Sequence, residues 1–182
     1  MRVISGQYRG KKLLAADEEI TRPTSDRAKE GLFNILNNYL LKNSKSWQEI
    51  FFCDVFAGSG AIGIEAVSRG TKNVFLFENN KLALKMIREN SKGMPVQIIE
   101  TDACFPPSAK NKMDIIFFDA PYGKGLWQKS LEAFYKQGWI DSNTLVIVEI
   151  DKKIKEEIPS SFICTREQEY GRNLFLFLQL GD

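Results

Sequence analysis

A carboxylate, a proline and an aromatic ring occur together in the segment Asp119-Ala120-Pro121-Tyr122. The apolar run that precedes it is typical of a buried strand. Open α/β sheets bind ligands at the carboxyl ends of their strands, so we expect this segment to face a ligand. Asp119 and a nearby backbone carbonyl can accept hydrogen bonds from an exocyclic amine, and Tyr122 can stack on a base. Such a site suits methylation of the amine, which depends on positioning and on acceptors beside the charge developing on nitrogen.

The same four residues, taken alone, also fit a strand-ending turn with a packed tyrosine. The chain contains no histidine, which is the commonest general base and transition-metal ligand. Amine methylation needs no strong base, because the methylated ammonium readily loses its proton to water or to Asp119. The composition therefore agrees with this chemistry and argues against triad hydrolases and most zinc enzymes. We predict no metal site.

A glycine-rich segment follows Asp54, where a predicted strand turns into a helix. Glycines at such a turn allow a sharp bend and let a ligand lie against the backbone. Gly58, Gly60 and Gly63 satisfy the spacing GxGxxG, which nicotinamide and flavin enzymes also use. A nicotinamide-dependent oxidoreductase is therefore an alternative, although it leaves the segment 119–122 unexplained.

Carboxylates at three strands favour S-adenosylmethionine as the cofactor. Asp54 interrupts an apolar strand, and a buried carboxylate needs a partner such as the cationic end of this cofactor. Glu78 ends the next strand, 18 residues after Gly60, where it can accept hydrogen bonds from ribose hydroxyls. Asp102 can accept one from the adenine amino group, although turns commonly use aspartate in this way. The residues predicted to bind the cofactor are Asp54, Phe56, Ala57, Gly58, Ser59, Gly60, Glu78, Asn79, Asp102, Ala103 and Asp119.

Short apolar runs alternate with amphipathic segments after residue 50, a pattern typical of a parallel sheet with crossover helices. Near the end, two runs are separated only by Gly171-Arg172-Asn173, so the sheet should finish in an antiparallel hairpin. We predict strands at 51–56, 73–78, 96–100, 114–119, 145–150, 162–170 and 174–180, and crossover helices at 61–68, 81–90 and 126–137.

The first residues predict a short β-hairpin over 2–14, followed by a helix capped by Thr24 or Ser25. Arg2, Arg9, Lys11 and Lys12 give this arm a basic bias, which suits a polyanion or an ordinary solvated terminus. The chain of 182 residues, 43% hydrophobic, suffices for one core, so we expect a single domain over 1–182 with an arm in 1–20.

The chain shows neither a signal peptide nor a membrane-spanning run, so we expect a soluble, cytoplasmic protein. Its three cysteines are far apart and form no CxxC pair. They predict buried free thiols rather than disulfides or a zinc site.

The sequence closely resembles the RsmD family of bacterial 16S ribosomal RNA guanine-N2 methyltransferases over nearly its whole length. The residues that carry the resemblance are Arg2 to Gly10, Arg22-Pro23-Thr24, Asp26-Arg27, Phe33-Asn34, Asp54 to Gly60, Asp119 to Tyr122 and Tyr170-Gly171. The resemblance implies a Rossmann-like class I methyltransferase with a seven-stranded, mostly parallel sheet and S-adenosylmethionine as donor. It also implies a guanine N2 of 16S rRNA as target, within the small ribosomal subunit or an assembly intermediate. We expect the protein to be a monomer.

Asp119, Ala120, Pro121 and Tyr122 occupy the catalytic positions of the family. Most members have proline where this chain has Ala120, a change that keeps the backbone carbonyl but loosens the turn. The residues expected to contact RNA are Arg2, Arg9, Lys11, Lys12, Arg22, Thr24, Arg27 and Tyr122. Alternatives are an amine methyltransferase acting on DNA adenine, another RNA or a protein glutamine, and a noncatalytic RNA-binding module.

Overall fold

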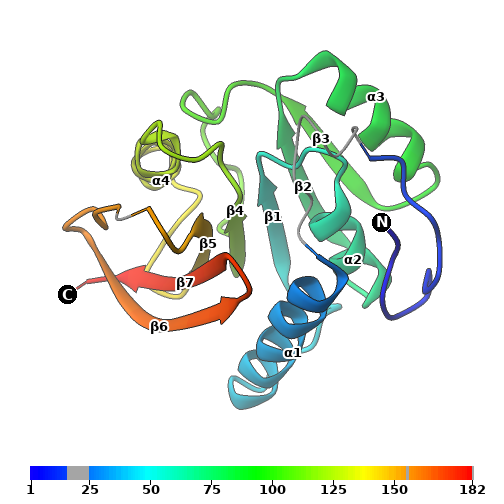
Figure 1. Cartoon of the computed structure of the whole chain (residues 1–182), viewed down its shortest axis with the longest axis horizontal. Helices are drawn as coiled ribbons and strands as arrows, with labels where there is room; N and C mark the ends of the chain where they lie inside the picture. Colours follow the sequence, from blue (N-terminus) through cyan, green and yellow to red (C-terminus); the bar gives the residue numbers. More distant parts are fainter. Residues whose placement is uncertain (16–24, 155, 182) are drawn as a thin grey trace.

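The protein is built on a seven-stranded sheet with strand order β3-β2-β1-β4-β5-β7-β6 (Figure 1). The computed structural model describes residues 1–15, 25–154 and 156–181. Strands β1 to β5 are parallel, whereas β7 runs antiparallel to both β5 and β6. The doubly wound order and the terminal hairpin are thus as predicted. The strands are β1 (Phe51–Val55), β2 (Asn73–Glu78), β3 (Val96–Glu100), β4 (Ile115–Phe118), β5 (Leu145–Asp151), β6 (Phe162–Tyr170) and β7 (Asn173–Leu180).

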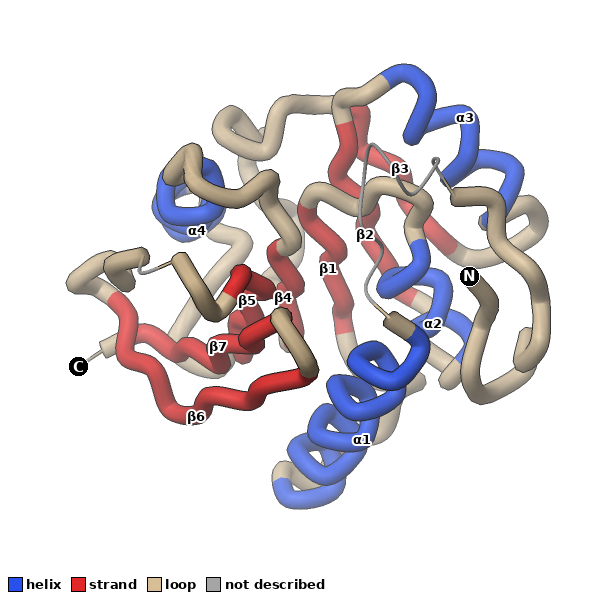
Figure 2. Tube along the Cα trace, viewed as in Figure 1, coloured by secondary structure: helices blue, strands red, loops and turns tan. Residues whose placement is uncertain are grey.

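Helices cover both faces of the sheet, as Figure 2 shows. Three of them contribute buried side chains to one core and the fourth contributes to the other. Among the described residues, no helix is long and apolar enough to cross a membrane. The first face carries α1 (Asp26–Lys42), α2 (Ala61–Ser68) and α3 (Lys81–Asn90), and the second carries α4 (Leu126–Lys136).

Alternation along the strands feeds both cores. In β1, Phe52 joins the core beneath α1 to α3, whereas Cys53 and Val55 join the core beneath α4. Strands buried on both faces need apolar residues at nearly every position, which explains their continuous apolar runs. Packing alone would select an apolar residue at every position of such a strand. The charged residues Asp54 and Glu149 therefore need another explanation.

The start of α2 packs closely on the sheet at Gly63. A Cβ there would lie 2.2 Å from Leu76 Cδ2 and 3.2 Å from Val74 Cγ1. Both side chains are fully buried, so they cannot yield without displacing the core. We expect Gly63→Ala to lower the free energy of unfolding by about 1–3 kcal/mol, measured by urea denaturation. A change below about 0.5 kcal/mol would show that the contact relaxes freely.

The predicted short hairpin over residues 2–14 is confirmed: Val3 N donates to Lys11 O at 3.0 Å, and Gly10 N donates to Val3 O at 2.9 Å. The arm forms a single antiparallel bridge, between Arg2 and Lys12, and no longer strands. Several of its backbone groups bond to α2 instead. The N–H groups of Ile4 and Ser5 donate to Glu65. Docking on a helix thus replaces part of the ladder that a longer hairpin would need.

Other boundaries differ by one or two residues. Strand β1 stops at Val55 because Phe56 adopts a left-handed conformation with φ 63°. The β6–β7 turn contains only Gly171 and Arg172, because Asn173 already pairs in β7. Strand β4 is shorter at both ends than 114–119, β5 extends one residue beyond 150, and α4 ends one residue before 137.

The structure also tests the predicted cap of the first helix and the predicted burial of the cysteines. Helix α1 is capped by Ser25, whose hydroxyl accepts a hydrogen bond from Ala28 N, while Thr24 lies outside the described residues. The cysteines are free, but burial holds only for Cys53, since Cys164 is exposed on β6. Because Cys164 faces outward on β6, the edge strand of the sheet, it lies outside both cores.

Candidate active site

Carboxylates from four neighbouring strands meet at the carboxyl edge of the sheet. Asp54 follows Phe52 by two residues, Asp119 follows Phe117, and Glu149 follows Ile147, so all three point to the face covered by α1 to α3. Parallel pairing of Phe118 with Val148 places the ends of β4 and β5 side by side. On the other side of β1, Glu78 ends β2 on the same face. This row forms the floor of the candidate site.

Asp54 is buried, with 2% of its surface exposed, and accepts a hydrogen bond of 2.9 Å from Gly63 N. Burial raises its pKa to about 8, with further contributions from Asp119 and Glu78, while the Gly63 hydrogen bond opposes the shift. A carboxylate placed in this way is stabilised in its charged form by a nearby cation. The residue therefore fits the cationic part of S-adenosylmethionine.

Asp119 and Tyr122 lie at one end of the candidate site. Burial raises the pKa of Asp119 to about 7. The pKa of Tyr122 is also raised, first by burial and then by the negative charges of Asp119 and Glu149. Tyr122 therefore stays a neutral phenol at physiological pH, and 41% of its surface remains exposed. A partly exposed aromatic ring beside a carboxylate can stack on a base whose amine reaches Asp119.

The glycine loop, residues 56–60, is tied to Glu78. The carboxylate accepts hydrogen bonds from Gly58 N at 2.8 Å, Asn79 N at 2.9 Å and Asn80 N at 2.8 Å. These bonds fix its orientation, use both lone pairs of Oε1 and leave one lone pair on Oε2 for a further donor. Glu78 thus holds the loop and can still accept a hydrogen bond from a ribose hydroxyl.

The loop after β3 brings Asp102 to the same edge of the sheet. Its carboxylate accepts a hydrogen bond of 2.8 Å from Cys104 N, which is the turn role also considered from the sequence. Asp102 is exposed, whereas Ala103 is buried in the core beneath α4. Its role toward adenine stays a prediction.

The basic residues of the arm are not gathered at the tetrad 119–122. Lys11 Nζ donates to Asn90 O at 2.7 Å, and Arg2 pairs with Asp26 at 3.3 Å. Arg9, Lys12 and Arg27 are exposed, and Arg22 and Thr24 lie outside the described residues.

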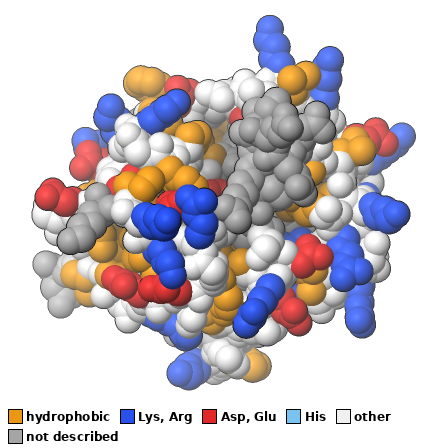
Figure 3. All heavy atoms as spheres, viewed as in Figure 1, with side chains coloured by type: hydrophobic (Ala, Val, Ile, Leu, Met, Phe, Trp, Pro, Cys, Tyr) orange, Lys and Arg blue, Asp and Glu red, His pale blue; other side chains and the backbone are white. Residues whose placement is uncertain are grey.

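A second basic group lies beside the tetrad. Arg172, in the β6–β7 turn, is close enough to Tyr122 to oppose the rise in its pKa. Its guanidinium pairs with Asp151 at 2.7 Å, and the next residue, Lys152, pairs with Glu169 on β6 at 3.0 Å. Figure 3 shows Lys and Arg side chains gathered over this end of β5 and β7. Sequence reasoning missed this group because its members are far apart along the chain.

The turn that carries the tetrad is held from outside by Glu156, in the segment between β5 and β6. Its carboxylate accepts hydrogen bonds from Gly123 N at 3.3 Å and from Trp127 Nε1. We expect Glu156→Ala to lower kcat on the order of tenfold, because the tetrad loses this support. Steady-state kinetics check this, with Glu157→Ala, a change in an exposed neighbour, as control. Equal kcat values for the two variants would contradict the role of Glu156.

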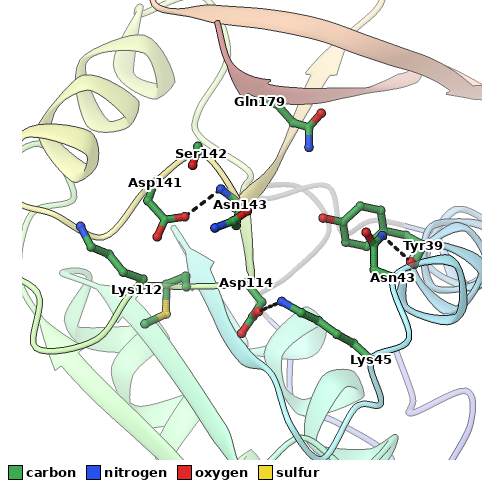
Figure 4. Close-up of a pocket in the computed structure, with 10 residues that line it drawn as sticks. Tyr39, Asn43, Lys45, Lys112, Asp114, Asp141, Ser142, Asn143 and Gln179 are labelled. Atoms are coloured by element: carbon green, nitrogen blue, oxygen red, sulfur yellow. Dashed lines mark hydrogen bonds and ion pairs between the residues drawn. The ribbon is translucent and has the colours of Figure 1, made fainter. Parts of the chain in front are cut away.

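A cavity of about 370 Å³ lies at the opposite edge of the sheet (Figure 4). Lys45 donates to Asp114 there, and this bond raises the pKa of Lys45. Asp114 also accepts a hydrogen bond of 2.9 Å from Phe51 N, which joins the starts of β1 and β4. These groups are already used in fixing strand ends. Among the described residues, no group of three or more Cys, Asp or Glu side chains is placed to hold a metal ion.

The fold and the carboxylates at its edge define a Rossmann-like methyltransferase. The chain belongs to the family described as Conserved hypothetical protein 95, which matches residues 1–179 and is the RsmD family that the sequence resembles. Ribosomal RNA small subunit methyltransferase D of Haemophilus influenzae is 30% identical over 179 residues, covering 94% of this chain and 89% of that protein.

Solved structures agree with this class. An Escherichia coli chain named as a methyltransferase has a TM-score of 0.79 at 26% identity, covering 99% of this chain and 97% of that one. The MtNAS chain solved in complex with S-adenosylmethionine shares the fold, with a TM-score of 0.62 at 14% identity, covering 86% of this chain and 67% of that one.

Proposed function

We propose that this protein methylates the exocyclic N2 amine of a guanine in 16S rRNA, with S-adenosylmethionine as donor. The observation that carries the proposal is the placement of Asp54 and Asp119 on one face, at the ends of adjacent strands β1 and β4. The first suits a cation and the second an amine. The name of the Haemophilus influenzae relative supports small-subunit rRNA as the substrate.

The residues present fit the cofactor. The glycine loop turns beside Glu78, which is oriented by three backbone N–H groups, and Asp54 is a buried carboxylate that a cation would keep charged. When bound, S-adenosylmethionine supplies an electrophilic methyl group on a positively charged sulfur.

The tetrad positions the target amine. Asp119 accepts a hydrogen bond from the amine, and the carbonyl of Ala120 or Pro121 accepts a second. These acceptors turn the nitrogen lone pair out of the plane of the base and stabilise the positive charge that develops on nitrogen. A proton then leaves the methylated amine for Asp119 or water, while Tyr122 stacks on the base.

The target base must be unpaired or turned out of its helix to reach this site. Edges of paired bases in folded RNA cannot enter a pocket of this kind without extrusion. A net charge of +2 gives only modest attraction to free RNA. We therefore propose a substrate that presents both RNA and protein, the small subunit or an assembly intermediate.

Transfer of tritium from methyl-labelled S-adenosylmethionine tests the proposal. The substrates are protein-free 16S rRNA, small subunits from a strain that lacks the modification, duplex DNA and a protein extract. We expect label in the subunits, recovered after nuclease digestion as N2-methylguanosine. Label in DNA, in protein or in another nucleoside would contradict the proposed target, and failure to bind the cofactor would contradict the proposed chemistry. Efficient methylation of protein-free rRNA at physiological salt would overturn only the composite substrate.

A further inference from the structure

The glycine loop has left-handed backbone conformations, one of which, at Phe56, is strained. Phe56, Gly58 and Gly60 have φ values of 63°, 56° and 78°. For a residue with a side chain, such as Phe56, this left-handed conformation costs about 1–2 kcal/mol. Strained segments persist where surrounding contacts hold them in place. Glu78 supplies such a contact through Gly58 N, and a second comes from Asn90 at the end of α3.

Asn90 joins the loop to the N-terminal arm. Its Nδ2 donates to Ser59 O and to Leu14 O, each at 2.9 Å, and its Oδ1 accepts from Leu14 N at 2.8 Å. The side chain is buried, with 3% of the residue exposed. An amide meets this demand because it combines two donor hydrogens with an acceptor oxygen. An aspartate would lose the bonds to both carbonyls.

The arm is itself a docked part of the domain. Glu65, fully buried in α2, accepts from Ile4 N at 2.7 Å and from Ser5 N at 3.0 Å. Gly6 lies against the end of α2, where a Cβ would be 1.8 Å from Ser68 O. Figure 2 shows the arm running along α2 and α3 to the side of the sheet that carries the glycine loop.

We propose that Asn90 is a positioning residue of the cofactor site, through which docking of the arm and binding of S-adenosylmethionine support each other. The inference rests on the proposed cofactor. When the arm leaves, Asn90 loses its bonds to Leu14, and the amide that holds Ser59 O is no longer fixed. The strained loop then relaxes away from the geometry that receives the cofactor. By linkage, the cofactor stabilises arm docking to the same extent.

Replacement of Asn90 tests the proposal by isothermal titration with S-adenosylhomocysteine. We expect Asn90→Ala to weaken binding on the order of tenfold, as is usual when a buried hydrogen-bond partner is removed. The matched control is Ser91→Ala. Ser91 is also buried, and its hydroxyl donates to Ile87 O at 2.7 Å within the same helix end. The control should lose stability but keep its affinity.

Gly6→Ala provides a second variant that leaves Asn90 intact. The added methyl group forces the arm away from α2, and it should weaken the binding of S-adenosylhomocysteine to a similar degree. Both changes break the same connection, from the arm through Asn90 to the glycine loop. The affinity of the double variant should therefore be about that of either single variant, and the two losses of affinity should not multiply. If Asn90→Ala does not fold, Gly6→Ala alone decides the test.

Binding by the unmodified protein distinguishes failure of the coupling from failure of the proposed function. If the unmodified protein binds S-adenosylhomocysteine but Asn90→Ala and Gly6→Ala bind within threefold of it, the coupling is absent and the proposed function stands. Losses that multiply in the double variant would show two independent effects and also overturn the coupling. If the unmodified protein does not bind, the proposed cofactor and this inference fail together.

Discussion

Replacing Asp119 by asparagine should reduce the rate of methyl transfer about 10²- to 10³-fold, the range typical of removing one preorganised group that stabilises charge in a transition state. Asparagine keeps the shape of the side chain and one acceptor oxygen, but it removes the negative charge beside the developing ammonium. Single-turnover transfer of tritium to small subunits, at saturating cofactor, measures this effect directly.

The control for this change lies at the other end of the same strand. Asp114→Asn makes the same substitution where the carboxylate bonds to Lys45 and Phe51 N, across the sheet from the tetrad. It should lower stability and leave the single-turnover rate within about threefold. Equal rates for Asp119→Asn and the unmodified protein would show that the tetrad is not the reactive centre.

The sequence predicts Asp54 and Asp119 because each carboxylate interrupts or ends an apolar run. Glu149 carries the same signal within 145–150, where it is the charged residue in an otherwise apolar strand. We did not predict it as a site residue, although it lies 2% exposed beside Asp119 and contributes to the raised pKa of Tyr122. A charged residue inside a strand that is buried on both faces is thus a usable signal wherever it occurs.

Other parts of the site have no local signal. Asn90 ends an amphipathic helix, and only tertiary packing brings it to Ser59 and Leu14. The left-handed backbone of Phe56 breaks a residue preference, so sequence patterns predict an extended conformation there instead. Lys11 fits a basic RNA-binding arm by composition, yet its ammonium group binds a helix-end carbonyl. Surface bias in charge does not show which charges the fold itself uses.

Cofactor affinity should rise with pH between about 6 and 8. The pKa of Asp54 is about 8 and that of Asp119 about 7, so both carboxyl groups are largely protonated at pH 6. A cationic ligand favours the charged carboxylate and must displace the proton. Each such group can contribute at most about tenfold in affinity per pH unit below its pKa. Titration calorimetry with S-adenosylmethionine across this range measures the slope.

Asp54→Asn should flatten this dependence and weaken binding at pH 8, where the unmodified carboxylate gains most from the cation. Asparagine can still accept the hydrogen bond from Gly63 N, so the loop should keep its position. A slope unchanged by the substitution would show that Asp54 does not contact the cation and that Asp119 or the ligand itself titrates.

The ligand-free protein should show the opposite trend in stability. The folded-state pKa of Asp54 is raised from 3.8 to about 8, so the folded state holds a proton that the unfolded chain has already lost over this range. The stability that the folded state gains from binding this proton is therefore lost progressively as pH rises from about 4 to 8. Asp54→Asn removes the titration, and its advantage over the unmodified protein should grow with pH in urea denaturation. Saturating S-adenosylmethionine should reverse that advantage, because the bound cofactor then supplies the positive charge that a buried carboxylate at this position requires.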